Sequence, residues 1–190
     1  MRILCFDPAG NFSDREGKGV TGWAYFIGNE LSDFGDIKAS NAVSIEEYWH
    51  NHDTLIDDFY YNYGVDVVVC ESFNLNPGKA GAQSWSSMET PQLIGYMRMS
   101  SWVRNLKFVL QRPATKARVT DEILEHMGVI QKKNSRYYAL NRQTNLHMRD
   151  AIRHGVYYLR YGTKKAVPFS KMTEEEQRQT MEAMRDENRD

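Results

Sequence analysis

Cysteine is scarce in this sequence, and long hydrophobic runs are absent. The 190 residues include two cysteines, Cys5 and Cys70, each inside a short apolar run, which is more typical of buried thiols than of a disulfide. No apolar run approaches the roughly 20 residues that a membrane-spanning helix needs, and the first residues have neither the apolar region nor the cleavage site of a signal peptide. We therefore expect one soluble domain, no membrane association and a reducing, cytoplasmic environment.

Charge is nearly balanced overall but unevenly distributed along the chain. The net charge is -1, yet residues 98–165 contain 15 lysines and arginines against 4 acids, while the remainder contains 9 against 21. A solvated surface is the simplest explanation of such charges. A basic segment that includes Trp102, Tyr137 and Tyr138 fits a polyanionic partner better.

The hydrophobic pattern predicts strands that alternate with helices. Strands are expected at residues 2–7, 20–27, 31–38, 65–72 and 107–111, and helices at 44–64, 91–106 and 144–162, with a turn and a short helix over 112–128. The first three strands should be antiparallel, and the last two, each reached through a helix, should be parallel to the first. The expected fold class is α/β, with a mixed five-stranded sheet flanked by helices.

Three segments have no place in this sheet. Residues 73–90 form a long Gly-, Ser- and Asn-rich loop, which in a compact domain is usually functional or mobile. Residues 134–143 are interpreted as a basic, aromatic loop. From Thr173, which forms a capping pattern with Glu176, the chain is highly charged. We expect a core domain of residues 1–165 and a charged, helical tail of residues 166–190.

Two carboxylates end predicted central strands. Asp7 follows the apolar run of residues 3–6, and Glu71 follows that of residues 67–70. Ligands of open α/β sheets bind at this edge. One such acid is most often a cap or a loop ligand, but two on neighbouring strands repel each other unless a cation lies between them or one stays protonated.

A third acid, Asp150, lies in the predicted helix of residues 144–162. His147 is three residues before it and His154 four residues after it, so the three share one helix face. Asp150 is either an exposed partner of an arginine, worth roughly 0.3–0.5 kcal/mol, or the third carboxylate of a site for a hard cation such as Mg²⁺ or Mn²⁺. The helix alone does not decide between these, nor whether His154 belongs to such a site.

Four segments, "ILCFDPAG", "TGWAYF", "VVVCESF" and "HMRDAIRHG", together resemble the RNase H-like, or retroviral-integrase, superfamily. Within it they look like the RuvC-type Holliday junction resolvases, with a phage member as the expected source. The resemblance spans about residues 1–161, although "DPAG" replaces the family's shorter turn. It maps the family's motif residues onto Asp7, Thr21, Gly22, Glu71, His147 and Asp150, and its turn after the fifth strand onto Pro113 and Lys116.

The resemblance implies an RNase H-like fold and a metal-dependent endonuclease. Asp7, Glu71, His147 and Asp150 would hold two Mg²⁺ or Mn²⁺ ions roughly 3.5–4 Å apart, one activating water and the other stabilising the leaving 3′ oxygen. Lys116 would neutralise charge that develops on the phosphate. The expected products carry a 5′-phosphate and a 3′-hydroxyl, and no small-molecule cofactor is expected.

The resemblance also implies that the partner is branched DNA. Basic side chains would contact phosphates without reading sequence, and Phe73, Trp85 or Tyr137 would stack on unpaired bases. The expected DNA contacts are Phe73, Lys79, Arg112, Lys116, Arg118, Lys132, Lys133, Arg136, Arg142 and Arg149. Resolvases of this type act as homodimers. The helix at 91–106 would therefore contribute either to the core or to a dimer face through Leu93, Met97, Met99, Trp102 and Val103.

Other functions remain open on the same residues. The same chemistry would serve a flap or fork nuclease, or an RNase H acting on RNA–DNA hybrids. A non-catalytic DNA-structure binder is less favoured, because clustered carboxylates weaken binding near phosphate. An actin-like ATPase has a similar first hairpin, but this chain is short for its usual duplicated domain.

Overall fold

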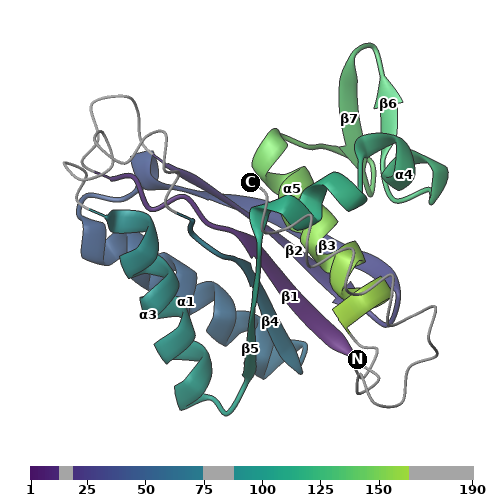
Figure 1. Cartoon of the computed structure of the whole chain (residues 1–190). Coiled ribbons are helices and arrows are strands. Elements are labelled where there is room, and N and C mark those ends of the chain that lie inside the picture. Colours follow the sequence, from purple (N-terminus) through teal and green to yellow (C-terminus); the bar gives the residue numbers. More distant parts are fainter. Residues whose placement is uncertain (13–18, 75–87, 163–190) are drawn as a thin grey trace, which may run out of the picture.

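The computed structural model describes residues 1–12, 19–74 and 88–162, and the element labels follow Figure 1. The main strands are β1 (Arg2–Asp7), β2 (Val20–Ile27), β3 (Glu30–Lys38), β4 (Val67–Glu71) and β5 (Lys107–Gln111). The helices are α1 (Ile45–Asn62), α3 (Glu89–Val103), α4 (Asp121–His126) and α5 (Leu146–Tyr157), with 3-10 turns η1 (Ala39–Asn41) and η3 (Pro113–Arg118). The proposed tail, together with Lys79 and Trp85, lies outside the described residues.

The main sheet has the order β3-β2-β1-β4-β5. β1 pairs antiparallel with β2, and β2 with β3, whereas β4 runs parallel to β1 and β5 parallel to β4. The predicted mixed five-stranded sheet is therefore confirmed, including the direction of each strand. No helix in the described ranges is long and apolar enough to cross a membrane.

Helices cover both faces of this sheet (Figure 1). α1 and α3 lie on one face, and α5 lies on the other. Because successive strand residues point to opposite faces, the strands divide between two cores. The residues packed on the α5 side include Ile3, Cys5, Val67, Val69 and Val109, while their neighbours Leu4, Phe6, Val68 and Cys70 pack on the α1 side. Cys5 and Cys70 are buried free thiols, as expected, and they pack on opposite faces of the sheet.

Helix α3 divides its apolar residues between the interior and the surface. Leu93 and Met97 have no exposed surface and belong to the core. Met99, Trp102 and Val103 are each more than half exposed, at 57%, 69% and 62%. Core packing therefore accounts for the first two residues and leaves the other three unexplained by the fold.

Helix α5 lies very close to β2 because two glycines remove side chains from the contact. A Cβ atom on Gly22 would meet the backbone oxygen of His147 at 2.0 Å, and one on Gly155 would meet the ring of Phe26 at 2.2 Å. Since Gly22 pairs with Asp7 in the sheet register, this approach brings the first turn of α5 directly over the end of β1.

Residues 131–143, partly interpreted from the sequence as a loop, form a second small sheet. Strands β6 (Gln131–Lys133), β7 (Arg136–Ala139) and β8 (Arg142–Gln143) pair antiparallel in that order. Positive φ at both central residues of each turn, Asn134–Ser135 and Leu140–Asn141, produces the tight hairpins. Figure 1 shows β6 and β7 projecting from the body of the molecule beside α4. We call residues 131–143 the basic ribbon.

Candidate metal centre

Three neighbouring parallel strands end in polar residues on the face that α5 covers. Asp7, Glu71 and Gln111 each lie two residues beyond an apolar residue of that face, and so they point the same way. The register pairs Phe6 with Cys70, which places Asp7 beside Glu71, and it pairs Glu71 with Gln111. The end of the sheet thus presents two carboxylates and an amide in a row.

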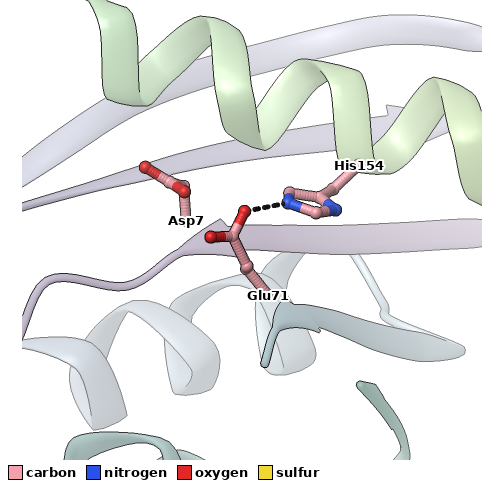
Figure 2. Close-up of side chains that lie close together, drawn as sticks. All are labelled: Asp7, Glu71 and His154. Atoms are coloured by element: carbon pink, nitrogen blue, oxygen red, sulfur yellow. Dashed lines mark hydrogen bonds and ion pairs between the residues drawn. The ribbon is translucent and has the colours of Figure 1, made fainter. Parts of the chain in front are cut away.

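Helix α5 supplies three further side chains from one stripe. His147, Asp150 and His154 face the sheet, with Asp150 and His154 only 7% and 0% exposed. The Nδ1 atom of His147 donates to Asp7 Oδ2 at 2.8 Å, and Nε2 of His154 lies 2.6 Å from Glu71 Oε2. Figure 2 shows His154 descending from α5 onto Glu71, with Asp7 beside them. Each strand-end acid therefore bonds to a histidine of this stripe, and His154, which the helix pattern left undecided, lies against Glu71.

The ammonium group of Lys116 lies among the three carboxylates. Its Nζ atom is 2.8 Å from Glu71 Oε2, 2.8 Å from Asp150 Oδ2 and 3.4 Å from Asp7 Oδ1. The η3 turn after β5 positions this lysine, which the sequence placed near phosphate rather than among the acids. Burial by itself would lower the pKa of Lys116, but its hydrogen bonds to Asp150 and Glu71 and the nearby charge of Asp7 outweigh burial and raise it. One fixed cation is thus shared by three acids.

Neighbouring groups also shift the pKa values of Glu71 and His147. Burial by itself would raise the pKa of Glu71, but hydrogen bonds from His154 and Lys116 outweigh it and hold that pKa below its usual range. The hydrogen bond to Asp7 raises the pKa of His147 against the opposing effect of burial. Glu71 is therefore a carboxylate at neutral pH.

A buried network fixes the turn that follows Asp7. The hydroxyl of Tyr48 donates to the Ala9 carbonyl at 2.8 Å, and the Ala9 amide donates to Thr21 Oγ1 at 3.2 Å. His52 Nδ1 donates to the Tyr48 carbonyl at 2.7 Å, so its Nε2 accepts from Thr21 Oγ1 at 2.9 Å. Burial lowers the pKa of His52 to about 4, which keeps the ring neutral, as this arrangement requires. The resemblance singled out Thr21, and the structure gives it a role in anchoring the Asp7 turn to α1.

The expected DNA contacts differ in their surroundings. Arg112, Arg118, Lys132, Lys133 and Arg136 are exposed. Arg142 is bonded to Asp33 and lies over the ring of Phe34 at 4.3 Å. Phe73, half-buried, packs against the core on the α1 side.

Two arginines of α5 are engaged within the protein. Arg149 is half-buried, pairs with Asp121 at 3.3 Å and lies over the ring of Tyr137. Arg153 binds Asp150 at 2.5 Å and Asp121 at 2.7 Å. Helical spacing places Arg153 three residues after Asp150, and this spacing allows the contact. Asp121 thus holds both arginines beside the cluster.

The donor set fits a hard divalent cation. Carboxylate oxygens are the ligands that Mg²⁺ and Mn²⁺ prefer, and one ligand atom each from Asp7, Glu71 and His154 lies within 4.8 Å of the others. Acids this close need a cation between them or a shared proton. Lys116 meets that need in the protein alone, so its Nζ marks a position suited to positive charge.

The sheet order and the helices on its two faces define an RNase H-like fold. Among solved structures, the chain is similar to T. thermophilus RuvC in complex with a Holliday junction substrate, at 12% identity and a TM-score of 0.62, covering 87% of this chain and 98% of that one. A second structure of Thermus thermophilus RuvC gives 13% identity, a TM-score of 0.61 and coverage of 87% and 99%. No protein-family model and no curated protein matches the sequence. The comparisons therefore show a RuvC-like fold.

Proposed function

We propose that the protein is a metal-dependent endonuclease that cleaves branched DNA, with the four-way Holliday junction as its substrate. The observation that carries this proposal is the meeting of Asp7, Glu71 and Asp150 around one cation position. It lies on a fold that is also seen in a resolvase bound to junction DNA. A purely structural role for such a cluster is disfavoured, because buried ion pairs rarely repay the cost of desolvating their charges.

Each residue of the cluster has a role in phosphodiester hydrolysis. Asp7, Glu71 and Asp150 would hold Mg²⁺ or Mn²⁺, which when bound activates water and stabilises the charge on the reacting oxygens. His147 has a side chain 40% exposed, so it lies on the solvent side of Asp7, where it would orient water or add a ligand. Lys116 contacts every acid of the cluster, and its ammonium group would stabilise the negative charge that develops on the scissile phosphate.

Basic side chains beside the cluster would hold the DNA backbone. An open hollow of about 300 Å³ adjoins the centre, lined by Lys116, Ala117, Thr120, Asp121, Glu122 and Arg153. The basic ribbon adds exposed Lys132, Lys133 and Arg136, none of which has an ion pair to an acid in the described part of the chain. Thr144 ties the ribbon to the start of α5 through two hydrogen bonds to Tyr137. Phosphates bound by the ribbon would thereby be placed relative to the catalytic helix.

A second copy of the chain would supply the second cut that resolution of a junction needs. The exposed apolar residues of α3, Met99, Trp102 and Val103, are suited to a twofold contact. Sedimentation of the wild type should give a dimer, and Trp102→Glu should give a monomer. A monomeric wild type at micromolar concentration would overturn the dimer.

A panel of substrates tests the proposal. The protein is incubated with a four-way junction, a flap, a fork, an RNA–DNA hybrid and a linear duplex, with Mg²⁺, Mn²⁺ or EDTA. We expect metal-dependent nicks in the junction that leave 5′-phosphate ends, and slower cutting of the linear duplex. Faster cleavage of the flap, the fork or the hybrid than of the four-way junction would identify that nucleic acid as the preferred substrate instead. Binding of the junction without cleavage in either metal would show that the protein is a non-catalytic DNA-structure binder.

A further inference from the structure

His154 is a histidine without exposed surface whose two ring nitrogens meet different partners. Nδ1 lies 2.7 Å from Gln111 Oε1, and Nε2 lies 2.6 Å from Glu71 Oε2. The amide of Gln111 comes from β5, the carboxylate of Glu71 from β4 and the imidazole from α5. The ring thus connects the end of the sheet to the helix at the centre of the cluster.

Gln111 determines which ring nitrogen carries hydrogen. Its Nε2 atom donates to the backbone carbonyl of His154 at 3.3 Å, so Oε1 is the atom that faces Nδ1. An amide oxygen only accepts, and therefore Nδ1 must be the N–H donor. Reversing the amide would set its oxygen against the His154 carbonyl, two acceptors with no hydrogen between them.

The other nitrogen therefore points at an anion. With hydrogen on Nδ1, the lone pair of Nε2 faces a carboxylate oxygen at 2.6 Å, and two acceptors at that distance need a cation between or beside them. A divalent cation bound there would supply that positive charge, and a ligating histidine characteristically gives its other N–H to an oxygen acceptor. Gln111 is that acceptor here.

We propose that His154 is a metal ligand through Nε2 and that Gln111 is the residue that positions it. This inference rests on the proposed function only in taking the cluster to hold a divalent cation. It adds one nitrogen ligand to the carboxylates of Asp7 and Glu71. It also assigns a role to Gln111, the polar residue that ends β5. Loss of the Gln111 acceptor should weaken metal binding, and a side chain that keeps an acceptor for Nδ1 should weaken it less.

Metal affinity, measured without DNA, tests the proposal. Mn²⁺ binding is followed by the electron paramagnetic resonance of the free ion, on proteins first shown by circular dichroism to be folded. We expect His154→Gln and Gln111→Met to weaken binding by about 10- to 100-fold. Gln111→Glu, which keeps an acceptor for Nδ1 but loses the donor to the His154 carbonyl, should bind more tightly than Gln111→Met. His126→Gln, an exposed histidine on α4, is the matched control and should change nothing.

The outcomes separate this inference from the proposed function. A wild type that binds no Mn²⁺ would overturn the metal centre itself. A wild type that binds Mn²⁺ while His154→Gln and Gln111→Met bind it equally well would overturn only the inference.

If a variant does not fold, the wild type provides the test. Two-bond ¹H–¹⁵N spectra of histidine-labelled protein at saturating Mg²⁺ should show His154 with hydrogen on Nδ1 and none on Nε2. Hydrogen on Nε2 under those conditions would refute the ligand assignment.

Discussion

The carboxylate cluster and the basic ribbon differ in where their charges lie and in whether those charges are paired. In the cluster, Asp7, Glu71 and Asp150 are largely buried and share one ammonium group, so every charge has a partner at a fixed distance. In the ribbon, Lys132 and Lys133 lie over tyrosine rings at 5.5 and 5.9 Å and keep their charge at the surface. The comparison indicates that the cluster is arranged for chemistry at one point, and the ribbon for binding an extended anion.

The largest effect should come from neutralising the cluster. Asp7→Asn, Glu71→Gln and Asp150→Asn should each reduce junction cleavage by orders of magnitude, because each removes a charge from the cation position. Junction binding in gel-shift assays should persist. Asp58→Asn, an exposed acid of α1, is the control. Full cleavage by any one of the three variants would exclude that residue from the centre.

Removing the shared cation should destabilise the protein when no metal is present. Lys116→Met leaves three carboxylates without their common partner, and the cost of breaking such a buried arrangement is roughly 3 kcal/mol. Urea unfolding in EDTA should show this loss, and Mg²⁺ should restore part of it. Lys38→Met, which removes an exposed lysine paired with Asp36, should change stability little. An unchanged Lys116→Met protein in EDTA would show that the acids do not depend on this lysine.

The network beneath the cluster should give stability a pH dependence of its own. Burial lowers the pKa of His52 to about 4 from 6.5. As the pH falls, His52 therefore takes up a proton at a higher pH in the unfolded chain than in the folded protein. Stability is full above pH 6.5 and declines by up to about 3 kcal/mol as the pH falls toward 4.

His52→Gln should remove that part of the decline, as measured by urea unfolding at several pH values. His50→Gln, an exposed histidine of the same helix, should retain it. Identical pH profiles for the wild type and His52→Gln would contradict the assignment.

The smallest effect should come from the ribbon, and it should concern binding rather than catalysis. Lys132→Ala, Lys133→Ala and Arg136→Ala combined should reduce the slope of log affinity against log salt by about 3, one for each lost phosphate contact. Cleavage of saturated junction should remain near the wild-type rate. Arg98→Ala, a cation exposed on the opposite layer, is the control. A combined variant that binds normally but cleaves slowly would reverse the roles of the two regions.

The cluster could be predicted in large part because its acids occupy positions that patterns identify. Asp7 and Glu71 end apolar strands that were expected to be neighbours. The helix pattern left the role of Asp150 open, and the resemblance to the RuvC-type resolvases grouped it with these two acids. The part played by Gln111 depended on register, because only the pairing of β5 with β4 sets it opposite Glu71. No local pattern specifies that pairing.

The ribbon was missed for a local reason. Its turns, Asn134–Ser135 and Leu140–Asn141, adopt positive φ without the glycine that usually indicates a tight hairpin. The partners of Arg142 and Arg149 were also beyond the reach of the sequence. Arg142 bonds to Asp33, 109 residues away, and such long-range contacts exist only once the chain has folded.

The central claim is that the carboxylate cluster binds a divalent cation at the position that Lys116 Nζ occupies here. Anomalous diffraction from crystals grown with Mn²⁺ tests this claim most directly. The account predicts an anomalous peak in contact with the carboxylates of Asp7 and Glu71, with Lys116 Nζ moved away from its present position among the acids. Saturating Mn²⁺ with no peak at the cluster, and Lys116 still bonded to all three carboxylates, would contradict it.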